Sequence, residues 1–340
     1  MTDTRLKVTR SQVLAFRRRV GALDERLAPG PGSLRRAAWA GLQDSMPRAA
    51  ALSINARVRG TRPDTWTDSS LVQIWGPRYS VFVVPRRDLA VFTLGRMPDD
   101  APGRRWAESV AGRLREVLNG APMTEREAAR GVGVKPNSLK FAAPTGTIVI
   151  RWDGARQPTL RLVAAPEVDP RAARLELARR YLHVYGPTTA GSFARWAGIN
   201  PRSALAVFDE LRKSLTAVRT PIGDAWILAA DEPEIHAPAA LAAPARLLPS
   251  GDAYFLLQGQ DRELLIPDAA HRAALWPSRV WPGALLVGGE IVGTWRRAAA
   301  TVTVQAWKRL SRAAREAVEA ESEAMPLPGV KGRITVRWEA

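Results

Sequence analysis

The 340-residue sequence contains no cysteine, which excludes disulfide frameworks, cysteine-ligated zinc, iron–sulfur clusters and thiol nucleophiles. Its three histidines, His183, His236 and His271, lie far apart, so no histidine metal motif can be recognised. The signatures of P-loop nucleotide hydrolases, zinc peptidases and serine esterases are missing as well. We therefore expect the protein to use no metal and no cofactor.

Long hydrophobic runs are also absent. No run approaches the roughly 18 apolar residues that a membrane-spanning helix needs, and the first residues, MTDTRLKVTRSQ, lack the apolar core of a signal peptide. With 46% hydrophobic and 24% charged residues, the composition is that of a globular protein. The sequence predicts a cytoplasmic protein of roughly two to four domains that makes no membrane contact.

Acidic residues are scarce relative to basic ones, 33 against 50, and the formal net charge is +17. Only six of the basic residues are lysines, and with abundant alanine this preference for arginine is typical of a GC-rich bacterial genome. Such a genome does not explain the excess of positive charge, which amounts to +14 over residues 1–235 and +3 over residues 236–340. The excess predicts a polyanionic partner, nucleic acid above all; a generally basic soluble enzyme is the alternative.

Residues 171–230 give the clearest architectural signal. A helical run ends at a Gly-Pro pair (186–187), a short helix follows, and Asn200 caps a third helix. Two short strands joined by a turn at Gly223 complete the segment. Helix, helix–turn–helix and hairpin in this order predict a winged helix, a fold whose third helix can enter the DNA major groove.

The same order of elements recurs at 104–165. An amphipathic helix precedes a second helix, which Thr124 and Glu127 begin as a capping box. A short third helix is expected over 136–143, and a hairpin turns around residues 153–156. The residues before this segment also carry helices and strands, and we interpret them as a third, more elaborated module of the same kind.

After an Ala/Pro-rich stretch at 235–246 the pattern changes to short strands. The expected strands lie at 253–258, 262–267, 284–289, 290–297, 300–307 and 333–338, with one charged helix at 311–324. This pattern predicts a small β-barrel or other β-rich domain.

The predicted fold class is therefore α+β, with tandem winged-helix (helix-turn-helix) modules followed by a small barrel-like or β-rich domain. The predicted boundaries are 1–100 for the N-terminal module, 101–168 and 169–234 for the two clearer winged helices, and 235–340 for the C-terminal domain.

Three stretches and the spacing of the winged helices resemble a known family. GLQDSMPRAAALSINARV, RLLPSGDAYFLL and PGALLVGGEIVGTWRR occur in the order found in the bacterial winged-helix family that includes the AlkZ and YcaQ DNA glycosylases. The resemblance covers nearly the whole chain. It implies tandem winged helices and a β-barrel around a positively charged channel for double-stranded DNA. It further implies a monofunctional enzyme, expected to be a monomer, that hydrolyses the N-glycosidic bond of alkylated purines, in some members at interstrand crosslinks.

The catalytic motif of this family, Gln-x-Gln or Gln-x-Asp, corresponds to residues 41–45. Gln43 matches the first position, Asp44 fills the middle one, and Ser45 stands where the second Gln or Asp is expected. Two polar side chains aimed at one water can position it and stabilise an oxocarbenium-like sugar, while a cationic N7-alkylpurine leaves readily. The resemblance implies Gln43, Ser45 and Asp44 as catalytic residues. For Asp44 and Ser45, capping of the helix after Pro47 is the alternative role.

A second segment of the family pattern, an R-G-T-L-H-like stretch after a Trp, corresponds to residues 75–82. Arg78 matches this pattern, and the resemblance implies that it binds DNA. Tyr79 and Phe82 stand where Gly and His are common. Whatever that His does in other members is therefore unavailable in this chain.

Further candidate DNA contacts lie on or beside the third helix of the 171–230 segment. They are Arg202, Ser203 and Lys213, which could bind phosphates or bases; a solvated helix face is the alternative. The favoured function is thus a DNA glycosylase. Two alternatives stay open: a non-catalytic DNA-binding protein, either a damage sensor or a transcriptional regulator, and a protein-interaction scaffold whose basicity is incidental.

Overall fold

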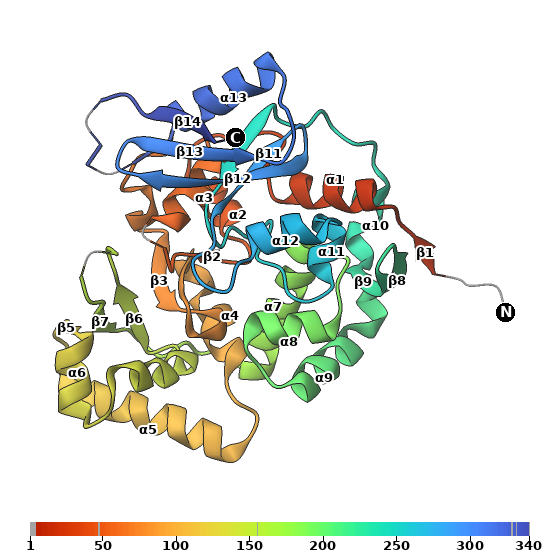
Figure 1. Cartoon of the computed structure of the whole chain (residues 1–340). Coiled ribbons are helices and arrows are strands. Elements are labelled where there is room, and N and C mark those ends of the chain that lie inside the picture. The colour runs from red at the N-terminus through yellow and green to blue at the C-terminus, as the bar shows by residue number, and fades with distance from the viewer. Residues whose placement is uncertain (1–4, 47, 155, 328, 331, 340) are drawn as a thin grey trace.

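The computed structural model describes residues 5–46, 48–154, 156–327, 329–330 and 332–339, and over these residues the fold is α+β with three separate sheets (Figure 1). The helices are α1 (Arg10–Val20), α2 (Pro31–Ala37), α3 (Ala49–Arg57), α4 (Leu89–Thr93), α5 (Ala101–Leu118), α6 (Glu125–Val132), α7 (Pro170–Tyr185), α8 (Ala190–Ala197), α9 (Pro201–Leu211), α10 (Glu232–His236), α11 (Asp261–Leu265), α12 (Ala269–Leu275) and α13 (Arg312–Glu323). The strands are β1 (Leu6–Lys7), β2 (Leu42–Gln43), β3 (Leu71–Trp75), β4 (Val81–Pro85), β5 (Met123–Thr124), β6 (Ile148–Arg151), β7 (Thr159–Leu162), β8 (Leu215–Thr220), β9 (Gly223–Leu228), β10 (Ala245–Leu248), β11 (Gly283–Val287), β12 (Glu290–Ala298), β13 (Thr301–Ala306) and β14 (Thr335–Glu339).

Local sequence signals place several of these helices. The predicted capping box of α6 is confirmed, because the Thr124 side chain accepts from the backbone N–H of Glu127 while the Glu127 carboxylate accepts from that of Thr124. Asn200 caps α9 as predicted, through its side-chain oxygen and the Arg202 N–H. Such caps satisfy backbone donors that the first turn of a helix leaves without partners.

The predicted order of elements is confirmed for the two central segments. In the first, α5, α6 and a 3₁₀ run at Pro136–Thr145 precede the antiparallel hairpin β6–β7. In the second, α7, α8 and α9 precede the antiparallel hairpin β8–β9. The third helical segment of the first unit is 3₁₀ and not α, and it contains Pro144, which cannot donate a backbone hydrogen bond.

Two sheets connect parts of the chain that are distant in sequence. The six-stranded sheet runs β2-β4-β3-β6-β7-β5, and the register pair Gln73 and Ile150 joins its two halves. The N-terminal strand β1 pairs in parallel with β8 of the second hairpin. Strand β2, which ends at Gln43, is therefore in the same sheet as the hairpin β6–β7.

The C-terminal part is β-rich as predicted, but the expected barrel is wrong. Its strands form an open sheet in the order β10-β11-β12-β13-β14, and within the described residues the edge strands β10 and β14 do not pair with each other. Helix α13 packs against both β10 and β14 (Figure 1). A helix thus covers the apolar face that closure of the sheet would otherwise have buried.

Two of the expected C-terminal strands are also wrong. Residues 253–258 form turns and irregular structure, and 262–267 lie largely in the short helix α11. Both runs are rich in buried apolar side chains. A short buried apolar run fits a strand and a helix equally well, so its periodicity could not decide between them.

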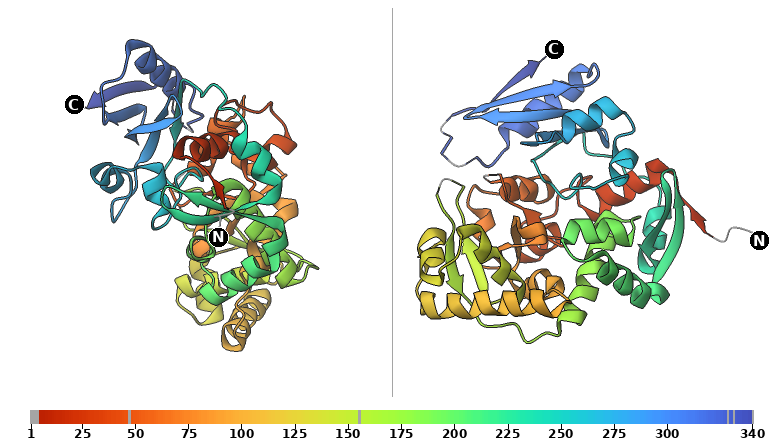
Figure 2. Two further views of the ribbon diagram at one scale, coloured as in Figure 1. Left: turned by 90° about the vertical axis from the view of Figure 1, so that its right-hand side faces the viewer. Right: turned by 60° about the horizontal axis from the view of Figure 1, so that its bottom comes forward.

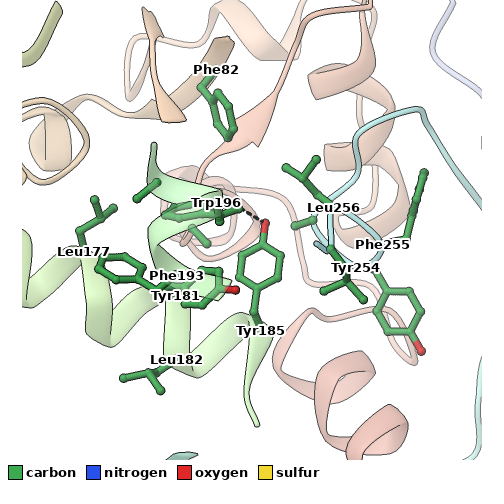
Figure 3. Close-up of a cluster of buried hydrophobic side chains, with 14 of the residues drawn as sticks. Phe82, Leu177, Tyr181, Leu182, Tyr185, Phe193, Trp196, Tyr254, Phe255 and Leu256 are labelled. Carbon is green, nitrogen blue, oxygen red and sulfur yellow. Dashed lines mark hydrogen bonds between the residues drawn. The ribbon is translucent and has the colours of Figure 1, made fainter. Parts of the chain in front are cut away.

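A cluster of buried aromatic side chains joins α7 and α8 to the turn at 254–256 (Figure 3). The rings of Tyr181 and Tyr185 stack with centroids 4.7 Å apart, and Trp196 Nε1 donates to the Tyr185 hydroxyl at 3.2 Å. Phe82 of β4 belongs to the same core. The strand next to β2 is thereby fixed to the helices of the second unit.

The arrangement places β2 and α3 between two parts of the molecule. The C-terminal sheet with α13 lies at one end and α5 with α6 at the other, with β2 and α3 between them (Figures 1 and 2). No helix in the described part of the chain is long and apolar enough to cross a membrane.

Candidate functional site

Gln43 ends an edge strand. It is the second residue of β2, and it lies opposite Phe82 in the antiparallel pair with β4. The chain then leaves the sheet and enters α3 at Ala49. Residues 43–46 therefore form the connection between sheet and helix, where side chains are free to point away from the sheet.

The amide of Gln43 lies between two other predicted site residues. Its Nε2 donates to Ser45 Oγ at 3.2 Å, and its Oε1 accepts from Arg78 Nη2 at 3.4 Å. The second contact is long for an N–H···O bond and correspondingly weak. The amide oxygen can therefore exchange Arg78 for another donor at small cost.

Both carboxylate oxygens of Asp44 are already engaged. Oδ1 accepts from the Ala50 N–H at 3.0 Å, and Oδ2 accepts from Gln73 Nε2 at 2.8 Å. The Gln73 amide is oriented in turn, because its Oε1 accepts from the Trp152 N–H at 2.6 Å. Only 1% of Asp44 is exposed. Its side chain thus binds the first turn of α3 and links it to β3, although the N-cap position of α3 is Arg48.

Burial also changes the ionisation of Asp44. Loss of hydration raises the pKa of its carboxyl from 3.8 to about 6. The Ala50 N–H, the charge of Arg48 and the Gln73 amide act in the opposite direction but do not cancel this effect.

Arg78 lies in a loop of unusual backbone geometry. Arg78 and Tyr79 have φ values of 54° and 58°, a left-handed conformation that side chains other than glycine rarely adopt. Arg96 stabilises this loop by donating hydrogen bonds to the carbonyls of Trp75 and Ala197 at 3.0 and 3.2 Å. Burial lowers the pKa of the Arg78 guanidinium, and its Nη1 is buried with no hydrogen-bond partner among the described residues.

A cavity of about 560 Å³ opens beside the motif. Ser45 and Arg78 belong to its wall, together with aromatic and polar side chains from β3, β4, the hairpin β6–β7 and the 101–145 segment. The lining residues are Ser45, Trp75, Arg78, Tyr79, Ser80, Val81, Glu125, Asn137, Lys140, Phe141, Trp152 and Pro158. The cavity thus lies between the motif and the first helix–helix–hairpin unit.

The three predicted contacts near α9 lie on a different element. Arg202 and Lys213 are exposed, on α9 and in the 3₁₀ turn after it. Ser203 faces Asp99: burial alone would raise the pKa of that carboxyl, but hydrogen bonds from Arg174 and Ser203 lower it. The structure therefore brings Gln43, Ser45 and Arg78 together and leaves the α9 residues apart from them.

Sequence reasoning missed one neighbour of Gln43. A Cβ placed on Gly251 would lie 3.3 Å from Gln43 Cδ, so the Gln43 side chain packs directly on this glycine. Its φ is +77°, which favours glycine. The signal that could have indicated it is the Ser-Gly-Asp turn within RLLPSGDAYFLL, a recognisable local pattern.

Asp252, the next residue, fixes that turn. Its fully buried carboxylate binds Arg57 in bidentate fashion at 2.7 and 2.8 Å, and it also accepts from Ser53 Oγ at 2.7 Å. Ser53 and Arg57 belong to α3. In the described part of the chain no group of three or more His, Asp or Glu side chains could hold a metal ion.

Comparison with known proteins identifies the family of the chain. Residues 36–326 match the family model described as DNA glycosylase AlkZ-like. The interstrand DNA cross-link repair glycosylase of Streptomyces sahachiroi is 28% identical over 206 residues, which are 59% of this chain and 52% of that protein. The chain therefore matches about half the length of this curated relative.

The fold is likewise similar to a solved one. The structure of Streptomyces sahachiroi DNA glycosylase AlkZ superposes with a TM-score of 0.79 at 22% identity, covering 98% of this chain and 100% of that chain. Because the family model matches most of the sequence, the chain belongs to the AlkZ-like DNA glycosylase family.

Proposed function

We propose that this protein is a DNA glycosylase that hydrolyses the N-glycosidic bond of alkylated purines in duplex DNA. The observation that carries the proposal is the Gln43 amide, which contacts both Ser45 Oγ and Arg78 beside a cavity of about 560 Å³. Membership of the AlkZ-like family supports the reaction class.

The main task of the protein in this reaction is to position the attacking water against the sugar. A water that donates a hydrogen bond to Gln43 Oε1, in place of the weak Arg78 contact, attacks C1′ of the sugar, and the C1′–N9 bond breaks. The bonding electrons neutralise the cationic N7-alkylpurine as it leaves, and the proton of the water passes to solvent. Ser45 Oγ, through its hydrogen bond to Nε2, keeps the amide in the required orientation.

DNA binding is assigned to the helix–helix–hairpin units. We propose that residues 101–168 and 169–234 are winged helices and that Arg202 and Lys213 bind phosphates of an intact duplex. The name of the Streptomyces relative, an interstrand cross-link repair glycosylase, makes crosslinked duplex DNA a second substrate to test.

Single-turnover base release from a duplex with N7-methylguanine tests the proposal. Gln43→Ala should slow release by roughly 10²–10³-fold, the loss seen when one positioned transition-state contact is removed, with DNA affinity within about twofold of wild type. Gln305→Ala, which removes an exposed glutamine on β13, is the matched control and should release base at the wild-type rate. Equal rates for Gln43→Ala and wild type would contradict the assignment.

One observation favours a non-catalytic DNA-binding protein as the second candidate. Ser45 is shorter than the Gln or Asp expected at its position, and Asp44 cannot replace it while both of its oxygens are engaged. Ser45→Gln, whose longer side chain has room in the adjoining cavity, should therefore raise the release rate. No release by either protein, with duplex binding intact, would favour the second candidate.

A further inference from the structure

We propose that the cavity beside Ser45 binds a nucleotide turned out of the duplex, with Phe141 stacking on its base and Arg78 and Lys140 facing its phosphate. This site, which rests on the glycosylase function proposed above, would hold the target nucleotide while its glycosidic bond lies at the motif. The following observations support it.

The first observation is the strained loop that forms one wall. Two consecutive residues, Arg78 and Tyr79, hold left-handed backbone conformations at φ 54° and 58° although neither is glycine. The backbone of Gly198, at the end of α8, packs against Arg78 and leaves no room for a Cβ to fit comfortably. Strain of this kind persists where the surroundings enforce it and is concentrated at ligand sites. Here the enforced loop presents both side chains to the cavity.

The second observation is an aromatic wall. The rings of Tyr79 and Phe141 meet edge to face, with centroids 5.3 Å apart, and the Arg96 guanidinium lies 5.0 Å from the centroid of the Tyr79 ring. Tyr79 is thus supported by Arg96 and in turn supports Phe141. Phe141 remains 40% exposed, so its ring is accessible from the cavity. A rigid, partly exposed ring is a platform on which a nucleobase can stack.

The third observation is the positive charge in the same wall. Arg78 Nη1 is buried without a hydrogen-bond partner among the described residues, and Lys140 forms no ion pair with any described residue. The same lining holds one acidic side chain, Glu125, which is half-buried, so two cationic groups stand against one anionic group. Two cationic donors suit a phosphate group. A nucleotide can contact both the aromatic and the cationic side chains of this cavity, because it joins a flat base to a phosphate. A free anion or an apolar ligand would contact only one of these two sets.

The cavity lies next to the motif residues that would act on the bound nucleotide. Ser45 belongs both to the lining and to the hydrogen bond with the Gln43 amide. A base held in the cavity therefore leaves its sugar close to Gln43. Enzymes that act on a base inside a duplex rotate the nucleotide out of the stack, and a pocket that stacks on the base pays part of the unstacking cost.

The experiment follows unstacking without chemistry. The duplex carries 2′-fluoro-N7-methylguanine, whose glycosidic bond resists hydrolysis, beside 2-aminopurine, which brightens when its neighbour leaves the stack. Saturating wild-type protein should raise the fluorescence. In Phe141→Ala the ratio of unstacked to stacked lesion should fall roughly 5- to 150-fold, the effect of losing one base–aromatic stack. The matched control is Trp106→Ala, which removes a 43% exposed ring on α5 outside the cavity and should keep the signal.

Two further variants separate stacking from folding. Phe141→Tyr keeps the ring and should keep the signal, whereas Phe141→Leu keeps apolar bulk and should lose it. A wild-type protein that binds the duplex without raising the fluorescence would overturn the site, as would a signal equal in Phe141→Ala and Trp106→Ala. If the signal depends on Phe141 but an ordinary N7-methylguanine duplex loses no base, the glycosylase function fails and the binding site stands.

Discussion

Asp44 keeps a buried carboxylate between the first turn of α3 and the Gln73 amide. Gln73 cannot turn its oxygen toward Asp44, because that oxygen already accepts from the Trp152 N–H. An asparagine at position 44 has only one acceptor, so its NH₂ group would face either the NH₂ group of Gln73 or the N–H of Ala50. In both cases two donors would face each other. The chain needs an acceptor on both sides here, and a carboxylate supplies it even though burial raises its pKa to about 6.

That raised pKa predicts how stability depends on pH. The folded protein binds an extra proton between pH 3.8, the unfolded value, and about 6, so stability falls as the pH rises through this window. The free energy of unfolding of wild type relative to Asp44→Asn should drop by about 1–3 kcal/mol from about pH 4 to pH 7 and then stay constant. Urea unfolding of both proteins across this range measures it. A difference that does not change with pH would show that Asp44 titrates normally.

Among the elements, α3 determines where Gln43 lies. Its first turn binds Asp44, one residue after Gln43, and its last turns bind Asp252, one residue after Gly251. The side chain of Gln43 and the glycine it packs on are therefore both fixed to one helix. The ion pair of Arg57 and Asp252 is buried, so loss of either partner would leave an unpaired charge in the core. Gly251 gives the milder test.

Gly251→Ala should slow base release by roughly 10- to 100-fold, because the new Cβ would displace the Gln43 amide. DNA affinity should not change. Gly120→Ala is the matched control: its φ of +81° carries a similar backbone cost of roughly 1–2 kcal/mol, and no atom lies within 4 Å of its Cβ position. In the Gln43→Ala background, Gly251→Ala should have no further effect on the rate. Additive losses in that double variant would mean that Gly251 acts independently of Gln43.

The elements also show which parts of the structure the sequence could predict. Thr124 and Asn200 sit at local signals, so their helices were predicted where they occur. The continuous apolar run at 254–256 predicts a strand, but the residues form a turn, which is organised by the Asp252 carboxylate as it accepts from the Tyr254 N–H. Gln43, Ser45 and Arg78 were identified together through the family resemblance. Their contact with Gly251 could not be predicted, because the turn signal at residues 250–252 does not indicate which segment, about 200 residues away, packs against it.

Across the whole molecule, some arginines are buried in structural contacts and others are available to bind DNA. Several arginines are buried and bind carbonyls at the ends of distant elements: Arg17 donates to the carbonyls of Tyr185 and Gly186, and Arg96 to those of Trp75 and Ala197. These side chains are not available to phosphates. The sequence gives the net charge, but it does not show which arginines are buried and which are available to phosphates, because the buried ones bind carbonyls far away in the chain. The number of phosphates bound must therefore be smaller than the excess of arginine suggests.

The salt dependence of DNA binding measures that number. If about six to ten phosphates are neutralised, affinity for an undamaged duplex should fall by roughly 10³–10⁵-fold between about 50 and 200 mM salt. Removing both exposed cations near α9, in Arg202→Ala/Lys213→Ala, should weaken binding to all sequences alike and reduce the slope of log K against log salt by about two. The matched control, Arg312→Ala, removes an exposed arginine of α13 that already pairs with Glu316, so it should leave the slope unchanged. Fluorescence anisotropy over a salt series tests all three proteins. An affinity independent of salt would contradict DNA binding by the winged-helix units. A slope in the double variant equal to that of wild type would place the phosphate contacts away from α9.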